Sequence, residues 1–247
     1  MVDVNGKWAL ITGATRGIGK LAAQFLAERG CNIIVHSRTL SASEKAAYEL
    51  RALGVKAHAV AAEFTDLSSV NKMLDSIDST GIEVDIILNN AGMQVAYRSE
   101  YTKTPAEDYE KSFLVNTIAP MMICYHFLPK MQVKGFGRIV NTTSGIRLEP
   151  EQAGYSASKA ALDKVTIDLG SKLNGSDITI NLTDPGWCRT DLGGPYATNS
   201  PESALPGVVV GAFIDDKRSG RIFSAGLFYD MTLEEAIIKA ESMKSPY

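Results

Sequence analysis

Short apolar runs alternate along the chain with longer stretches in which apolar residues recur every three or four positions. The runs lie near Trp8, Ile33, Val60, Ile86, Ile139, Ile180 and Ile222. Brief apolar runs predict strands buried on both faces, and their alternation with helical periodicity predicts βαβ units. We therefore expect an α/β fold with one doubly wound parallel sheet of about seven strands, helices on both faces and right-handed crossovers.

The helical periodicity predicts helices at residues 18–29, 41–53, 67–79, 106–131, 154–173 and 232–244. Pro120 lies inside the fourth of these and is expected to bend it, because proline has no N–H to donate to the preceding turn. No linker or repeat interrupts the pattern, and 247 residues with 45% apolar content can bury a sizeable core. The sequence therefore predicts a single domain over residues 1–247.

A glycine-rich turn follows the first apolar run. WALI, residues 8–11, leads into TGATRGIG, residues 12–19, and then into an amphipathic stretch. Gly13 and Gly17 would let the backbone turn tightly beside a pyrophosphate, and Gly19 would let the next helix pack closely on the sheet. In isolation such glycines are also compatible with an ordinary turn. Between a strand and a helix they favour a dinucleotide site at the helix N-terminus.

The end of the second strand bears on which dinucleotide binds. An NAD site places a carboxylate there for the ribose 2′-hydroxyl, whereas this chain has Ser37 and Arg38, and no acidic residue lies between Gly30 and Ser43. Arg16, in the glycine turn, supplies a second guanidinium. Guanidinium groups bind phosphate with paired hydrogen bonds, so the pattern favours NADP(H). The alternative for Arg38 is a solvated loop charge.

Tyr155 and Lys159 stand four positions apart in the run YSASK. This spacing places a phenol and an ammonium on one face of a helix. A fixed positive charge nearby favours the phenolate form, so the pair is expected to lower the pKa of Tyr155 and ease proton transfer. The same spacing also occurs in ordinary surface helices, so other motifs must decide.

Further motifs follow in order: NNAG at residues 89–92, FLVNTIAP with Asn116, GRIVNTTSG ending at Ser144 and Gly145, and later PGWCRTDL. Together with YSASK and the glycine turn, they make the chain resemble the short-chain dehydrogenase/reductase family over roughly residues 4–195. The resemblance is to carbonyl-reductase-like or 3-oxoacyl-reductase-like members. It implies a Rossmann-type domain that reduces carbonyls or oxidises alcohols with a nicotinamide cofactor.

The resemblance assigns a role to each of four catalytic residues. Ser144 would hydrogen-bond the substrate oxygen, and Tyr155 would donate or accept the proton. Lys159 would hold the nicotinamide ribose and tune the tyrosine, while the backbone carbonyl of Asn116 would hold a water of a proton relay. Thr143 is the alternative to Ser144, because the interval to Tyr155 is about two residues shorter than is common in the family.

The resemblance also implies cofactor and substrate residues. The expected cofactor residues are Gly13, Thr15, Arg16, Gly17, Ile18, Gly19, Ser37, Arg38, Glu63, Phe64, Asn90, Ala91, Gly92, Tyr155, Lys159, Pro185, Gly186, Cys188 and Thr190. Glu63 stands where relatives carry an adenine-contacting aspartate, and Cys188 is expected to act through its backbone. Met93, Gln94, Trp187 and Tyr196 would line the substrate pocket, with residues 186–206 as the substrate loop.

The implied reaction is the NADP(H)-dependent reduction of a ketone, aldehyde, quinone or 3-oxoacyl group to an alcohol. The alternative is a non-catalytic NADP(H)-binding sensor or regulatory protein, since fold does not fix function. Helices carrying Asn116 and Tyr155 often form family interfaces, so a homodimer or homotetramer is expected. The sequence does not indicate the physiological substrate, the direction or the stereochemistry.

Composition narrows the remaining classes of function. The net charge is −3 with scattered basic residues, which argues against nucleic-acid binding. Cys31, Cys124 and Cys188 are far apart, which argues against disulfides and a metal cluster and for a reducing compartment. His36 is expected to have a structural or solvent-facing role. With no signal peptide and no apolar stretch approaching about 20 residues, we expect a cytoplasmic protein without membrane contact.

Overall fold

A seven-stranded parallel sheet organises the computed structural model, which describes residues 1–246. The strands are β1 (Trp8–Ile11), β2 (Asn32–Ser37), β3 (Ala57–Ala61), β4 (Ile86–Asn89), β5 (Gly137–Thr142), β6 (Ile178–Asp184) and β7 (Ile222–Ser224). Their order is β3-β2-β1-β4-β5-β6-β7, and every neighbouring pair is parallel. The predicted α/β fold with a doubly wound sheet is confirmed.

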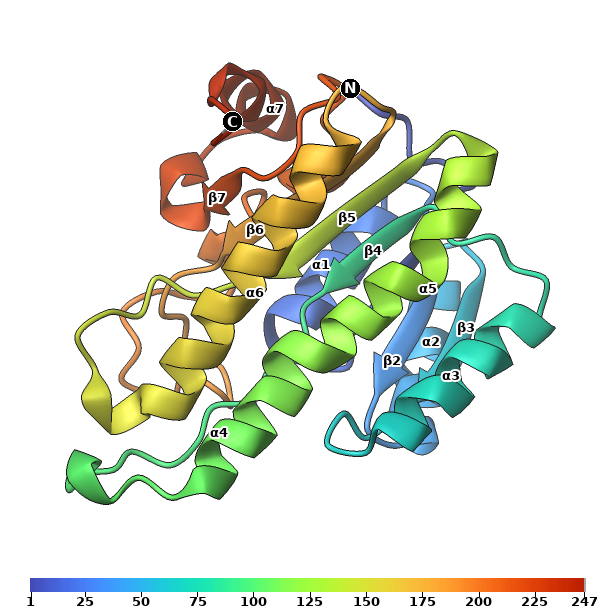
Figure 1. The fold of residues 1–247 in the computed structure, drawn as a ribbon. Helices are drawn as coiled ribbons and strands as arrows, with labels where there is room; N and C mark the ends of the chain where they lie inside the picture. Colours follow the sequence, from blue (N-terminus) through green and yellow to red (C-terminus); the bar gives the residue numbers. More distant parts are fainter. Residues whose placement is uncertain (247) are drawn as a thin grey trace.

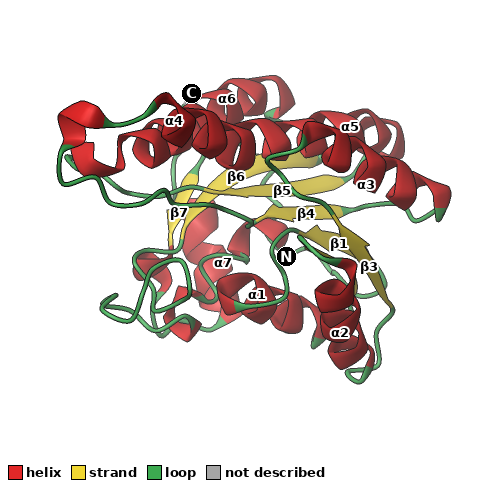
Figure 2. Ribbon diagram, turned by 90° about the horizontal axis from the view of Figure 1, so that it is seen from below, coloured by secondary structure: helices red, strands yellow, loops and turns green. Residues whose placement is uncertain are grey.

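Helices cover both faces of this sheet (Figures 1 and 2). One layer contains α1 (Gly17–Ala27), α2 (Leu40–Arg51) and α7 (Leu233–Ser242), and the other contains α3 (Leu67–Ser79), α4 (Ala106–Phe113), α5 (Ala119–Lys134) and α6 (Ala153–Leu173). Successive strand residues alternate between the two cores: Ile33 packs in one and Ile34 in the other, and both are fully buried. This explains why the strands appear in the sequence as continuous apolar runs.

The expected helix over 106–131 is interrupted. A π-helical segment, Leu114–Ile118, separates α4 from α5, and the Ala119 N–H donates to the carbonyl of Leu114, five residues earlier. Pro120 lies in the first turn of α5 rather than at an internal bend. Because proline has no N–H, the carbonyl four residues earlier, that of Asn116, lacks this donor. The irregular helix therefore places Asn116 in a locally opened backbone.

The helical run Ala106–Lys134 also corrects one expectation. Its length and its mean hydropathy of 1.2 over the most apolar window would permit a membrane span. The sequence analysis had expected no apolar stretch near the length that a membrane span needs. The window is 61% buried within the protein. Phe127, Leu128 and Met131 pack in the sheet core. The apolar character of this run is thus largely accounted for by packing.

The strand order reverses between β1 and β4, because β1 is followed in sequence by its neighbour β2 on one side while β4 pairs on the other. In open α/β sheets, ligands bind outside the carboxyl ends of the strands at such a switch point. The glycine turn follows β1 and the NNAG motif spans the end of β4. Both motifs therefore lie where the topology opens a crevice.

Candidate active site

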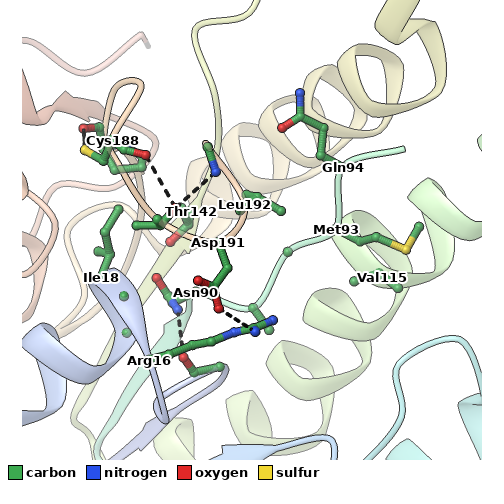
Figure 3. A pocket seen from close by; sticks show the side chains of 18 of the residues that line it. Arg16, Ile18, Asn90, Met93, Gln94, Val115, Thr142, Cys188, Asp191 and Leu192 are labelled. Carbon is green, nitrogen blue, oxygen red and sulfur yellow. Dashed lines mark hydrogen bonds and ion pairs between the residues drawn. The ribbon is translucent and has the colours of Figure 1, made fainter. Parts of the chain in front are cut away.

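A cavity of about 1270 Å³ opens at the carboxyl ends of the strands (Figure 3). All nineteen residues predicted to contact the cofactor line it, as do Ser144, Met93, Gln94 and Trp187. Thus segments from the glycine turn to the loop after β6 meet around a single space. Asn116 does not line the cavity and is fully buried behind it.

The glycine turn forms a cradle at the N-terminus of α1. Gly13 and Gly17 have φ angles of 67° and 52°, the left-handed region that glycine occupies without strain. A side chain at Gly19 would place its Cβ 2.3 Å from the carbonyl oxygen of Gly13 and 2.4 Å from Nδ2 of Asn90. The same Asn90 amide donates to the carbonyl of Thr12 at 3.0 Å. The NNAG segment therefore packs against the turn and fixes it at the N-terminus of α1, where a phosphate group could bind.

Replacing Gly19 with alanine is expected to weaken NADPH binding at least about tenfold, because the new Cβ would displace the turn that carries Gly13. Fluorescence titration of NADPH measures this. Gly226→Ala is the matched control, since a Cβ there meets nothing within 4 Å. An unchanged dissociation constant in Gly19→Ala would remove the glycine turn from the cofactor site.

The part of the cavity beside β2 and β3 contains His36, Phe64, Arg38 and Lys45. His36 stacks on Phe64 with ring centroids 4.4 Å apart, and its Nδ1 accepts from the Gly13 N–H at 3.3 Å. Its Nε2 lies 3.1 Å from the carbonyl oxygen of Ala62. Burial lowers the pKa of His36 to about 4, so the ring is neutral at physiological pH. It has the expected structural role, and it also lines the cavity.

Arg16 forms an exposed ion pair at the cavity. Its Nη1 lies 2.7 Å from Oδ2 of Asp191, in the loop after β6, and both side chains are more than 60% exposed (Figure 3). Sequence reasoning had grouped Arg16 with Arg38 around a 2′-phosphate. In the structure Arg16 lines the cavity and pairs with Asp191 there, and its predicted contact with a 2′-phosphate stays a prediction. Arg38 and Lys45 make no ion pair among residues 1–246.

Tyr155 and Lys159 lie on the cavity side of α6, 8% and 4% exposed. Nζ of Lys159 is 5.9 Å from the centre of the Tyr155 ring and donates to the carbonyl oxygen of Thr142 at 2.7 Å. Burial lowers the pKa of Lys159 to about 8, although Asp163 and Asp184 oppose the shift. The two groups thus share one buried end of the cavity, as their spacing predicted.

The pKa of Tyr155 moves in the opposite direction from the prediction. Burial raises it, a hydrogen bond with Ser144 lowers it in part, and the charge of Asp184 raises it further. The sequence-based expectation considered only the charge of Lys159 and omitted the cost of removing a phenolate from water. In this structure the phenol is therefore the favoured form of Tyr155.

The structure distinguishes the two candidates for the substrate-oxygen donor. Ser144 lines the cavity together with Tyr155 and acts on its pKa, and its Oγ accepts from the Ile146 N–H at 3.3 Å. Thr143 is 3% exposed, and its backbone N–H pairs with the Thr183 carbonyl in β6. Its hydroxyl lies toward Asp163 without a hydrogen bond of normal length. The side chain that accompanies Tyr155 is thus that of Ser144.

Asn116 connects three parts of the site. Its Oδ1 accepts from the Met93 N–H at 2.8 Å, and its Nδ2 donates to the Met93 carbonyl at 2.8 Å and to Oγ of Ser158 at 3.0 Å. A Cβ added to Gly92 would lie 3.5 Å from Oδ1 of Asn116 and 3.6 Å from Nζ of Lys159. Asn116 therefore positions the segment after β4 against α6.

The substrate side requires one correction. Trp187 is half exposed at the cavity, and its Nε1 donates to the Gly193 carbonyl at 2.8 Å. Tyr196, by contrast, is 88% exposed and does not line the cavity. The loop turns at Gly194 (φ 76°) and directs the following residues away from the site. Sequence reasoning also missed Arg147, Gln152 and Asp184, which do line it.

Cys188 is held inside the loop after β6. Its Sγ donates to the Pro185 carbonyl at 3.3 Å, its backbone forms a bridge with Asn199, and burial raises its pKa. A thiol in this state is a poor nucleophile. Among residues 1–246, no three His, Cys, Asp or Glu side chains are grouped to hold a metal ion.

Comparison with known sequences places this architecture among relatives. The family model described as short chain dehydrogenase matches residues 7–200. The chain is 30% identical over 226 residues to an uncharacterized oxidoreductase of Mycobacterium tuberculosis, with 87% of this chain and 66% of the relative covered. It is 31% identical over 194 residues to the 3-oxoacyl-[acyl-carrier-protein] reductase FabG of Aquifex aeolicus, with 77% of each covered.

Solved structures agree with this placement. A 7α-hydroxysteroid dehydrogenase complexed with NADH and 7-oxo glycochenodeoxycholic acid matches with a TM-score of 0.77 and 25% identity, covering 90% of this chain and 93% of that one. A blue fluorescent protein from a metagenomic library, in complex with NADPH, matches with a TM-score of 0.76 and 26% identity, covering 90% and 97%. The chain belongs to the short-chain dehydrogenase/reductase family.

Proposed function

We propose that the protein is an NADP(H)-dependent oxidoreductase that reduces a ketone, aldehyde, quinone or 3-oxoacyl group to an alcohol. The observation that carries this proposal is that Ser144, Tyr155 and Lys159 line the same cavity as the glycine cradle. The cradle fits a dinucleotide, because Gly13 and Gly17 turn the backbone at positive φ and Gly19 lets α1 pack closely on the turn, as in a strand–turn–helix phosphate site. A bound nicotinamide would supply the hydride.

Residues of the chain would bind the substrate oxygen and supply its proton. Ser144 and Tyr155 both line the cavity, and their hydroxyls would bond one substrate oxygen together, which would stabilise the negative charge that develops there. Tyr155 gives its proton to that oxygen as the general acid. The Lys159 ammonium stabilises the phenolate that remains. The Asn116 carbonyl, which cannot accept from Pro120 four residues on, would hold a water that returns the proton from solvent.

The proposed preference for NADP(H) rests on the part of the cavity beside β2 and β3, where the adenosine of the cofactor would lie. Arg38 and Lys45 are exposed there, and the β2 strand ends in Ser37 rather than a carboxylate. Glu63 also lines this end, but its Oε1 accepts from the Thr65 N–H at 3.2 Å. Lys45 is a further candidate cation beside Arg38, and Arg16, whose pair with Asp191 is exposed, remains a candidate as well. One related structure contains NADH and the other contains NADPH. The cofactor preference of this chain is therefore argued from its own cationic side chains.

The closing experiment follows NADPH oxidation across ketones, aldehydes, quinones and 3-oxoacyl thioesters, with NADH in parallel. Arg38→Ala is expected to raise KM for NADPH about tenfold while leaving that for NADH unchanged, because a charge-assisted bond to the 2′-phosphate is lost. Lys172→Ala, in the last turn of α6 and away from the cavity, is the control. Equal use of NADH by the wild type would contradict the NADP(H) assignment. Tight NADPH binding without any turnover would favour the regulatory alternative.

A further inference from the structure

Gln152 is a polar side chain of the cavity wall that the proposed reaction does not use. It lines the cavity, although it is only 5% exposed. Its Nε2 donates to the carbonyl oxygen of Val95 at 3.1 Å, whereas its Oε1 is buried and has no hydrogen-bond partner among residues 1–246. Buried polar atoms are nearly always paired, because an unpaired one has lost its bonds to water and gained none. Gln152 therefore holds an unused acceptor.

The contact with Val95 fixes which end of the Gln152 amide is free. A backbone carbonyl accepts hydrogen bonds and donates none, so the amide nitrogen must face it. Turning the amide over would bring two oxygens together and break the bond that holds the side chain. The free end of Gln152 is therefore an acceptor, and a ligand that satisfies it must supply a donor.

Gln152 also stands next to the proposed proton donor in the fold. It ends a short 3-10 turn, Pro150–Gln152, and is the N-cap residue of α6, and Tyr155 follows it by three residues. Residues three positions apart face the same side of a helix. Both side chains line the cavity. A substrate whose carbonyl oxygen is bound by Tyr155 would therefore have its adjoining carbons on the side of the cavity that Gln152 lines.

The two segments that meet at this contact, residues 93–98 and the start of α6, are held together by further bonds. The Arg98 N–H donates to the Glu151 carbonyl at 3.0 Å. The Arg98 guanidinium makes paired bonds to the Asp108 carboxylate at 2.7 and 3.0 Å. A Cβ added to Gly154 would lie 2.7 Å from the Asp108 carbonyl oxygen, so α6 begins in close contact with α4. The acceptor is thus held in place before a ligand binds, which lowers the cost of ordering on binding.

We propose that Gln152 is a specificity-determining residue whose Oε1 accepts a hydrogen bond from a hydroxyl near the substrate carbonyl, so that the substrate is a hydroxyketone or hydroxyaldehyde. This inference rests on the proposed function and narrows its substrate class. A simple ketone or a 3-oxoacyl thioester has only acceptors and apolar groups around the reacting carbonyl and would leave Oε1 unpaired. Sites that bond a substrate hydroxyl reject analogues without one strongly, because the buried polar group then stays unpaired.

Gln152→Met tests the proposal, because methionine keeps the length of the side chain and removes the acceptor. NADPH-dependent kcat/KM is measured for two pairs of ketones in which a methyl group replaces the hydroxyl: hydroxyacetone with butanone, and 4-hydroxybutan-2-one with pentan-2-one. The readout is the ratio within a pair, compared between wild type and variant. This comparison cancels any loss of folding or cofactor binding and the greater intrinsic reactivity of a hydroxyketone. We expect the ratio to fall about tenfold in Gln152→Met for at least one pair.

Gln132→Met, on the exposed side of α5 and outside the cavity, is the matched control and should leave both ratios unchanged. Gln152→Glu keeps an acceptor oxygen and should retain most of the preference; it is also the second variant if Gln152→Met folds poorly. Equal losses for both members of each pair in Gln152→Met would show a purely structural role and overturn the proposal.

A wild-type protein that turns over no carbonyl would overturn the proposed function instead. The same pairs are then compared by saturation-transfer NMR in the complex with NADP⁺. A binding preference for the hydroxyketones that Gln152→Met abolishes would support the acceptor role of Gln152. Equal binding of both members of each pair would overturn it.

Discussion

Replacing Tyr155 with phenylalanine is expected to lower kcat/KM for carbonyl reduction by roughly 10²- to 10⁴-fold, the usual contribution of a positioned general acid. The ring is only 8% exposed, so phenylalanine keeps the packing and removes the hydroxyl alone. The remaining Ser144 hydroxyl would still bond the substrate oxygen, but no group would give it a proton. Steady-state rates with the best substrate of the panel measure the loss.

The binding of NADPH separates this chemical loss from a structural one. Its dissociation constant in Tyr155→Phe should stay within about threefold of the wild type, because the phosphate cradle lies at the other end of the cavity. Ser144→Ala and Thr143→Val form a matched pair for the neighbouring hydroxyls. If Thr143→Val lost more activity than Ser144→Ala, the assignment of Ser144 would be wrong. A Tyr155→Phe enzyme with full activity would remove the tyrosine from the mechanism.

Local patterns were sufficient for the sheet. Ile33, Ile86, Ile139 and Ile180 are buried in strands because runs of β-branched residues fit a sheet covered on both faces. The glycine turn could also be predicted from the sequence, because positive φ at Gly13 is a local requirement of the backbone. These features depend on neighbours within a few residues, so the sequence alone predicts them.

Features that depend on distant partners were not predictable in this way. Arg16 meets Asp191, 175 residues later, only because the loop after β6 returns over the glycine turn. Tyr196 points into solvent because of a turn at Gly194 whose direction no periodicity encodes. The pKa of Tyr155 depends on burial and on Asp184, and neither can be inferred from the spacing between Tyr155 and Lys159. Each of these requires the fold before the chemistry can be argued.

The C-terminal segment contains a buried ion pair between two residues that lie close in the sequence. Arg221, next to β7, is fully buried, and both of its terminal nitrogens bond Asp216 at 2.5 and 2.8 Å. They also donate to the carbonyls of Ala240, in α7, and Arg218. Asp216 is 13% exposed, and although burial alone would raise its pKa, its bonds with Arg221 and Arg218 lower it overall. The pair joins the edge strand to the last helix.

Asp216→Ala is therefore expected to lower the free energy of unfolding by about 3–5 kcal/mol, because it leaves the Arg221 charge buried without its counterion. Urea unfolding followed by circular dichroism measures the loss. Since the pKa of Asp216 is lower in the folded protein, its contribution is present above the unfolded value of about 3.9 and is lost as the pH falls through the folded value. The difference between wild type and variant should shrink at acid pH.

A second variant separates the ion pair from the general burial of this region. Asp216→Asn with Arg221→Met removes both charges and should lose less than Asp216→Ala alone, because no uncompensated guanidinium remains inside. Asp168→Asn breaks an exposed pair with Lys164 and should change stability little. If Asp216→Ala were no less stable than Asp168→Asn, the buried guanidinium would be held by the carbonyls of Ala240 and Arg218 alone, and the attachment of β7 to α7 would not depend on the carboxylate.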